Sequence, residues 1–440
     1  MRVKILCLIL ALCFCFLTGC QSGLITPTDT AEETKTEEKK PEKVYPNVGN
    51  PLSWEKIREI PIANDSMTGE ELRKICVDYM RLQLTFEWTP AKTLSYYFET
   101  RGYSMDFPEG RVYGGLPYKT FDGNGNLYIF MDYYNPETGV LDPGKIAGKN
   151  FFSIIGNDCA SGPFWAWSRA INSITNFEDF ENQNGFTNIG LTPQNNLIPV
   201  GGYKSISEGT WDDGNGTKAV LQQNGTKKMY ECYAQMLEAD GLIRLHPKSE
   251  GSTSSANHLM MVSGKPKVVR NDDGTINGDR SFVTIMDQES HMTEQLTENG
   301  IVHYEGGIDL VYTFSQLYED CFAPFTFKEF LKTDPVEKAE ASIKVDGDMY
   351  DYETLKTGTL SANYGISHVR ITFFDKDGNK EYSYRPIPKD CDTRNFKLKN
   401  LLLPASKWHA TEENTCVITA FLGTGEEIEV LRGTVYQKNS

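Results

Sequence analysis

The stretch Gly156-Asn157-Asp158-Cys159-Ala160-Ser161-Gly162 leads directly into a run rich in apolar residues and largely decides the fold that we expect. From Phe164 to Ile174 the apolar residues recur at helical spacing, which predicts a helix. Pro163 is compatible with the start of that helix, because the first four N–H groups of a helix have no partner within it. Cys159 is therefore expected at or just before a helix N-terminus, where the helix dipole lowers the pKa of a thiol. The alternative is a buried structural cysteine at a helix cap.

A second marker is His258, which opens an apolar stretch and so predicts the start of a strand. A turn-rich segment follows, so we expect a hairpin with strands at residues 259–269 and 281–286. If these strands pair symmetrically about the turn, His258 lies opposite Asp287, with their Cβ atoms about 4.5–5.5 Å apart. A carboxylate in that place would fix the tautomer of the imidazole and stabilise the imidazolium.

The hairpin leaves alternatives to Asp287 as the partner of the histidine. A slip of two residues brings Glu289 to the same face of the strand, whereas Gln288 points away. His291 is the third choice, because it follows the expected end of the strand. A carboxylate that merely ends a strand in solvent is the structural alternative.

The order of cysteine at a helix start, histidine at a strand start and polar residue on the next strand is similar to that of two groups of papain-like enzymes, the NlpC-type cell-wall endopeptidases and the CHAP-type amidases. Gly114-Gly115-Leu116-Pro117-Tyr118 resembles the Gly-x-Pro-Tyr segment of NlpC-type proteins, and Asp158-Cys159 with Ser161-Gly162 resembles their Asp-Cys-Ser-Gly. Ala239-Asp240-Gly241-Leu242-Ile243 resembles their Gly-Asp-Leu strand, with the first two members exchanged. Asp287-Gln288-Glu289 is similar to the Glu-Gln-Asn of CHAP amidases.

The resemblance implies a papain-like core with insertions, in which Cys159 is the nucleophile, His258 the base and Asp287 the orienting group. It implies no metal and no cofactor. The sequence departs from the families in the insertion of Ala160 and in the roughly one hundred residues between cysteine and histidine. Further residues are expected to line the site or help to orient the histidine: Tyr118, Asp158, Ser161, Gln288 and Glu289.

The N-terminus has the pattern of an export signal, with a basic start and an apolar run too short to span a bilayer comfortably. Leu17-Thr18-Gly19-Cys20 resembles the bacterial lipobox, which implies lipidation at Cys20 and a membrane anchor on the outer face of the cell membrane. Residues 21–48 are mostly Thr, Glu, Lys and Pro, so we expect a disordered stalk. An ordinary signal peptide cut near Cys20 is the alternative.

Length and charge define the remaining organisation. A chain of 440 residues predicts two folded units after the leader, and a net charge of −16 argues against nucleic acid as a partner. We expect a monomer with an α+β hydrolase domain at residues 49–332 and a small all-β domain of immunoglobulin type at residues 333–440. Strands are expected at residues 366–374, 381–385, 396–402, 416–422 and 428–435.

Ten cysteines are present, and the leader accounts for Cys7, Cys13, Cys15 and Cys20. The spacings of the remaining six fit no zinc site, and the separation of Cys391 from Cys416 suits a disulfide between neighbouring strands. The Asp- and Asn-rich residues 271–277 predict a turn rather than a calcium loop.

These features favour a surface hydrolase that cleaves amide bonds, with peptidoglycan peptides as the first choice of substrate. A second hypothesis keeps the triad but assigns protein or other acyl substrates. A third is a non-catalytic lipoprotein that binds glycans through aromatic side chains. For the last, Trp165, Trp167 and Trp211 are available, although the pair near Cys159 is expected in the core.

Overall fold

The computed structural model describes residues 43–98, 103–118, 127–144, 155–172, 197–204, 216–244, 258–384, 394–402 and 414–436. In these ranges the chain forms a large mixed sheet with helices, together with smaller antiparallel sheets. This agrees with the predicted α+β class. The expected leader, the lipobox at Cys20 and nearly all of the expected stalk lie outside the described residues. No helix in the described ranges is long and apolar enough to cross a membrane.

The large sheet contains ten strands, and most neighbouring strands are antiparallel. The parallel pairs are β1 with β6 and β4 with β11. The order of the strands across the sheet is β5 (Tyr134–Asn135), β6 (Val140–Leu141), β1 (Glu87–Pro90), β4 (Val112–Gly114), β11 (Gly300–Thr313), β10 (Phe282–Thr297), β9 (His258–Val262), β8 (Gly241–Arg244), β12 (Ala323–Phe327) and β7 (Leu197–Pro199). A separate hairpin joins β2 (Leu94–Phe98) to β3 (Tyr103–Phe107).

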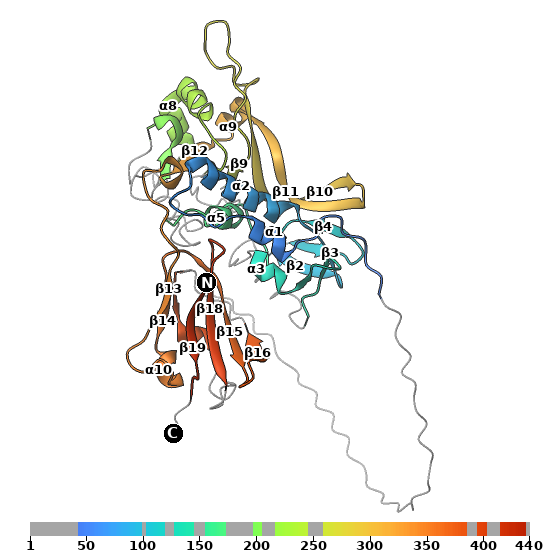
Figure 1. Ribbon diagram of the computed structural model, residues 1–440. Helices are drawn as coiled ribbons and strands as arrows, with labels where there is room; N and C mark the ends of the chain where they lie inside the picture. The colour runs from blue at the N-terminus through green and yellow to red at the C-terminus, as the bar shows by residue number, and fades with distance from the viewer. Residues whose placement is uncertain are drawn as a thin grey trace, which may run out of the picture. The chain divides into compact units, whose positions relative to one another are not determined.

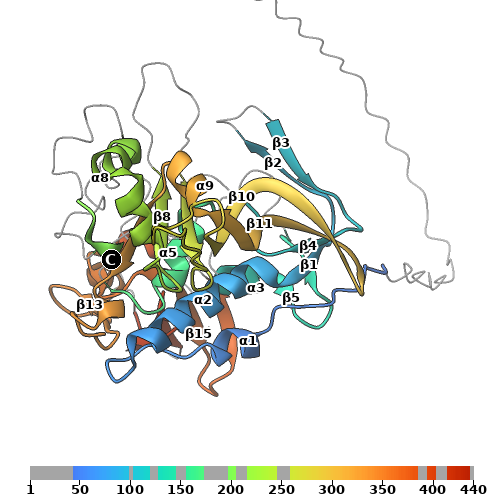
Figure 2. The ribbon, with the colours of Figure 1, turned by 90° about the horizontal axis from the view of Figure 1, so that it is seen from above.

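Two helices pack against the middle of this sheet. Helix α2 (Gly69–Thr85) begins with a capping box of Thr68 and Glu71, and it contacts β10, β11 and α5. Helix α5 (Ser161–Trp167) lies close to the predicted start near Cys159 and contacts β9 and β10. Figures 1 and 2 show both helices beside these strands. The other helices of this region are α1 (Trp54–Glu59), α3 (Leu127–Met131), η2 (Val200–Gly202), α8 (Gly216–Tyr233), α9 (Phe314–Glu319) and η3 (Glu329–Leu331).

Aromatic side chains fill the interior between the helices and the sheet. Trp165 and Trp167 are 1% and 0% exposed, so the expectation that this pair belongs to the core is confirmed. Trp167 packs edge-on against Phe325 and Phe327 of β12. Trp211 lies outside the described residues. The tryptophans near Cys159 therefore stabilise the fold and offer no exposed ring for stacking a glycan.

The hairpin that follows His258 differs from the prediction in register and in length. His258 begins β9 as predicted, but the strand ends at Val262. The ladder pairs Ile285 with Val262 and Met286 with Met261, a shift of two residues from symmetric pairing. The shift arises because residues 263–281 form an irregular loop with only an isolated bridge to β10.

Strand β10 also continues well beyond its predicted end. It runs to Thr297 and pairs with β11 over most of its length, as the long hairpin in Figure 1 shows. His291 therefore lies within the strand, exposed to solvent, and the expectation that it follows the strand end is wrong.

The C-terminal region has two antiparallel sheets. One contains β16 (Lys380–Tyr384), β15 (Ile366–Phe374), β18 (Thr415–Leu422) and β19 (Glu427–Gly433), in agreement with four predicted strands. The other contains β13 (Ala341–Lys344), β14 (Thr359–Ala362) and β17 (Asn395–Lys397). The strand predicted at residues 396–402 is wrong beyond Lys397, because α11 (Leu398–Leu401) follows; α10 (Tyr352–Lys356) is another short helix here. Buried residues of both sheets form one core cluster.

Of the two cysteines expected to form a disulfide in this region, only Cys416 lies within the described residues. Cys416 is a buried thiol in β18, and burial raises its pKa to about 12. Cys391 lies outside the described residues.

One glycine of the Gly-x-Pro-Tyr-like segment is required by a close approach of two backbones. Gly115 has a φ of +74°, and a Cβ there would lie 2.9 Å from the Cα and the carbonyl oxygen of Leu84. Gly110 has a φ of +81°, but a Cβ there would meet no heavy atom within 4 Å. Alanine substitutions at these two glycines therefore separate the free-energy cost of the left-handed backbone conformation from the cost of the contact with Leu84.

We expect Gly115→Ala to lower the free energy of unfolding by about 2–4 kcal/mol, because the left-handed conformation and the clash with α2 both oppose a side chain. Gly110→Ala should lose only about 1 kcal/mol, from the dihedral angle alone. Urea unfolding of both variants measures the difference. Equal losses would show that the approach of Leu84 imposes no constraint.

Candidate functional site

The turn that carries Cys159 is fixed by its two neighbours in the predicted motif. Asp158 Oδ1 accepts hydrogen bonds from the N–H groups of Ala160 and Ser161, at 3.0 and 2.7 Å, and from Ser161 Oγ at 2.9 Å. The N–H of Asp158 donates in return to Ser161 Oγ, and the N–H of Gly162 donates to the Asp158 carbonyl. Asp158 thus fixes the turn that leads into α5, and Cys159 lies two residues before the first residue of that helix.

Burial separates the cysteine from the residues that hold it. Asp158 and Ser161 are 6% and 1% exposed, whereas Cys159 is half-buried. Asp158 and Ser161, which were expected to line the site, therefore fix the conformation of the turn. The Cys159 side chain remains partly exposed to solvent.

The Gly-x-Pro-Tyr-like segment lies directly beside this turn. The N–H of Asn157 donates to the Pro117 carbonyl at 3.0 Å, and Tyr118 and Asn157 form a parallel bridge. The N–H of Tyr118 donates to Glu305 Oε2 at 2.6 Å, and the Tyr118 side chain is 6% exposed. Tyr118 thus lies opposite Asn157, two residues before Cys159, close to the position that the motif predicted.

His258 and Asp287 form the predicted contact. His258 Nε2 lies 3.2 Å from Asp287 Oδ2, and the side chain of Asp287 is almost fully buried while that of His258 is 16% exposed. Continued by one residue, the ladder of β9 and β10 sets Asp287 opposite Met260, so the imidazole and the carboxylate meet diagonally. Since Nε2 faces the carboxylate, the ring nitrogen that could serve a nucleophile is Nδ1.

A bulge in the β10–β11 hairpin positions Asp287. The pairing passes from Asp287 with Gly307 to Met292 with Glu305, so residues 288–291 face Gly306 alone. Gly306 has a φ of +134°, and a Cβ there would lie 2.5 Å from the Asp287 carbonyl oxygen. The N–H of Gly307 donates to Asp287 Oδ1 at 3.0 Å. The bulge therefore supplies the second hydrogen bond to this carboxylate.

Gln288 points away from His258, as the alternation along the strand predicted. Its amide donates to the carbonyls of Leu116 and Glu305, both at 2.8 Å, and the side chain is fully buried. Gln288 therefore joins the hairpin to the Gly-x-Pro-Tyr-like segment and does not orient the histidine. Glu289, two residues from Asp287, is half-buried and lies within the bulge.

Sequence reasoning missed three buried polar residues of the same network: Gln83, Asn157 and Glu305. Gln83 of α2 donates to the Gly162 carbonyl at 3.1 Å and accepts from Asn157 Nδ2 at 2.8 Å. Glu305 accepts the hydrogen bond from the Tyr118 N–H. The available signal was a polar residue at a position where the periodicity of α2 or β11 places a buried side chain. A search for apolar positions does not reveal such residues.

Burial raises the pKa of Glu305 to about 8, and the hydrogen bond from the Tyr118 N–H lowers it only in part. The side chain is 4% exposed, and Oε1 has no hydrogen-bond partner among the described residues. Glu305 is therefore a neutral acid at pH 7.

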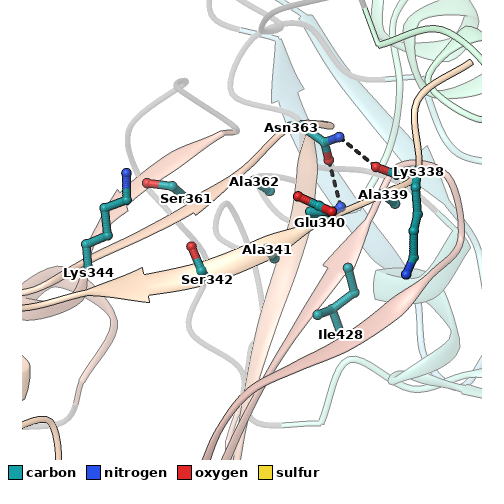
Figure 3. A pocket seen from close by; sticks show the side chains of 10 residues that line it. All are labelled: Lys338, Ala339, Glu340, Ala341, Ser342, Lys344, Ser361, Ala362, Asn363 and Ile428. Atoms are coloured by element: carbon teal, nitrogen blue, oxygen red, sulfur yellow. Dashed lines mark hydrogen bonds between the residues drawn. The ribbon is translucent and has the colours of Figure 1, made fainter. Parts of the chain in front are cut away.

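The described residues contain no group of three or more His, Cys, Asp or Glu side chains able to hold a metal ion. A cavity of about 510 Å³ lies on the C-terminal sheets, where strands β13, β14 and β19 contribute residues (Figure 3). Asn363 there bonds to the backbone of Lys338 and Glu340. None of the predicted site residues lines this cavity.

Comparisons of the chain with protein-family models, with curated proteins and with solved structures find no match. The likeness to NlpC-type and CHAP-type enzymes therefore depends on the sequence motifs quoted above.

The neutral state of Glu305 predicts a particular pH dependence of stability. The unfolded chain loses this proton near pH 4.5, whereas the folded chain keeps it to about pH 8. The folded state binds more protons in that window, so stability falls as the pH rises from about 4.5 to 8. Glu305→Gln keeps an acceptor for the Tyr118 N–H and cannot ionise.

We therefore expect Glu305→Gln to be more stable than the wild type, by a margin that grows with pH. At pH 8 its free energy of unfolding should be higher by roughly 2–4 kcal/mol. Urea unfolding at about pH 5, 7 and 8.5 measures this gain. Glu298→Gln, at an exposed position of the hairpin turn, is the control and should leave the pH profile unchanged. If the difference in free energy of unfolding between Glu305→Gln and the wild type stayed constant across the pH series, Glu305 would not be a neutral acid in the folded protein.

Proposed function

We propose that the protein is a cysteine hydrolase of papain-like fold that cleaves amide bonds in peptidoglycan peptides, with Cys159, His258 and Asp287 as its triad. The observation that carries the proposal is the contact of 3.2 Å between His258 Nε2 and Asp287 Oδ2 on strands against which the Cys159 helix packs. A buried carboxylate that accepts from a backbone N–H and faces a histidine is the orienting arrangement of such triads.

The packing of three elements supports a joint role for these residues. Helix α5 contacts β9, which begins with His258, and β10, which carries Asp287. A Cβ placed on Gly162 would lie 3.5 Å from the Cβ of Gln288. The backbone of α5 at Gly162 thus lies so close to β10 that an added side chain would contact Gln288.

The chemistry follows from these roles. His258 takes the proton of the Cys159 thiol, and Sγ attacks the carbonyl carbon of the amide while the backbone N–H of Cys159 stabilises the oxyanion. His258 then gives the proton to the amide nitrogen, so the amine leaves and a thioester remains. Water, losing a proton to His258, attacks the thioester; the acid is released, and the proton returns to the thiolate. Asp287 stabilises the imidazolium throughout.

The two ends of the chain support a location at the cell surface. The lipobox-like Leu17-Thr18-Gly19-Cys20 and the polar residues 21–48 suit a lipid anchor followed by a stalk, which would hold the hydrolase near the cell wall. The two antiparallel sheets of the C-terminal region suit an immunoglobulin-like domain. A second substrate class, protein or another acyl donor, uses the same triad.

Thiol labelling tests the nucleophile before any substrate is known. We expect iodoacetamide at about pH 7 to modify Cys159 at least about tenfold faster in the wild type than in His258→Ala, because the base promotes thiolate formation. Cys321 provides an internal control, since it is also half-buried and burial raises its pKa. Peptide mapping by mass spectrometry measures both sites. Equal rates at Cys159 with and without His258 would contradict the dyad.

The orienting role predicts different effects for two neighbouring carboxylates. Asp287→Asn should leave the melting temperature nearly unchanged while lowering turnover of purified peptidoglycan by at least about 100-fold, because it favours the wrong tautomer. Glu289→Gln, two residues away within the bulge, should retain most activity. Released peptides measured by mass spectrometry give both values. If the Glu289 variant were the impaired one, the assignment of the orienting group would be wrong.

A further inference from the structure

One amide of helix α2 bonds to both sides of the turn that carries Cys159. Gln83 Nε2 donates to the Gly162 carbonyl at 3.1 Å, and Gln83 Oε1 accepts from Asn157 Nδ2 at 2.8 Å. Asn157 lies two residues before Cys159, and Gly162 lies three residues after it. A single side chain therefore ties the two ends of this turn to the same point of α2.

The surroundings of Gln83 fix the orientation of its amide. The Gly162 carbonyl can only accept, so an amide turned over would set two oxygens against each other. Gln83 and Asn157 are both 0% exposed, and Asn157 Oδ1 has no hydrogen-bond partner within the described ranges. In those ranges Gln83 is therefore the only hydrogen-bond partner of the Asn157 side chain. Without Gln83, this buried amide would have to move to find another partner.

The backbone of Gln83 adds a connection to the Gly-x-Pro-Tyr-like segment. The N–H of Leu116 donates to the Gln83 carbonyl at 2.8 Å. The next residue of that segment, Pro117, accepts the N–H of Asn157 at 3.0 Å. Asn157 is thus bonded through its side chain to α2 and through its backbone to a segment that α2 also holds. The approach to Cys159 from the N-terminal side is therefore fixed by two bonds that both lead back to Gln83.

We propose that Gln83 is a positioning residue that holds the Cys159 thiol where His258 can take its proton. The proposal rests on the triad function proposed above. Gln83 acts through Asn157 and Gly162 and takes no part in proton transfer. A displacement of a reacting group by about 1 Å can cost about 100-fold in rate, so a fixed turn matters more to the reaction than to the fold.

A double-mutant cycle tests whether Gln83 controls the action of His258 on the thiol. In the wild type, we expect His258→Ala to slow the reaction of Cys159 with iodoacetamide about tenfold at about pH 7. In a Gln83→Met background the same change should slow the reaction less than about threefold, because a displaced thiol gains little from the base. Peptide mapping measures the four rate constants. Urea unfolding establishes that each variant is folded under the labelling conditions.

Thr326→Val is the control for a loss of stability. Thr326 of β12 is 4% exposed, and its Oγ1 accepts from Nη2 of Arg73, another residue of α2, at 2.8 Å. The variant removes a buried hydrogen bond of the same helix without touching the bonds of Gln83. It should lower the stability of the fold and leave the tenfold effect of His258→Ala unchanged.

Gln83→Glu is the conservative variant, and it serves in place of Gln83→Met if the latter does not fold. At about pH 5.5 a buried carboxyl keeps its proton, so it can accept from Asn157 and donate to the Gly162 carbonyl. The effect of His258→Ala should then match that in the wild type at the same pH. At about pH 8 the ionised carboxylate cannot donate to Gly162, and the effect should be smaller than in the wild type.

Two results would overturn the proposal. One is an equal effect of His258→Ala in the wild type and in the Gln83 variants at every pH, which would leave Gln83 a role in stability alone. The other is a reduced effect in Thr326→Val, since any loss of stability would then suffice. Failure of the triad gives a different result, because His258→Ala would then have no effect in the wild type itself.

Discussion

The carboxylate of Asp287 is held on both oxygens, by the N–H of Gly307 on one side and by His258 on the other. The first bond forms where the hairpin is bulged, and the bulge includes Gly306, whose positive φ favours glycine. The geometry of the candidate site thus depends on an irregularity of the sheet.

Two carboxyl groups on this hairpin illustrate how environment sets chemical role. Asp287 has a backbone donor for one oxygen and an imidazole beside the other. Glu305 has one backbone donor and otherwise only buried surroundings, so it keeps its proton. The neutral acid can accept the hydrogen bond from the Tyr118 N–H beside the Cys159 turn without placing a negative charge at this buried position.

The sequence predicted the local features of the site well and the non-local ones poorly. The helix start near Cys159 and the strand start at His258 follow from the spacing of apolar residues, which is a property of neighbouring residues. The partner Asp287 follows from the hairpin that joins its strand to that of His258. The register of β9 with β10, the bulge and the buried amide network depend on loops and on partners far along the chain. Apolar patterning carries no information about Gln83 or Glu305, since their role is to bond buried backbone groups.

The sequence predicts the contact between His258 and Asp287 from a strand register that differs by two residues from the register in the structure. The contact survives because side chains alternate with a period of two, so a displacement of two preserves the face of the sheet and changes a direct neighbour into a diagonal one. At a diagonal separation of about 7–8 Å between backbones, an imidazole and a carboxylate can still meet. A displacement of one would have turned Gln288 toward the histidine and buried Asp287 elsewhere. Site chemistry on a strand is therefore more predictable than the topology that surrounds it, provided that the parity of the register is right.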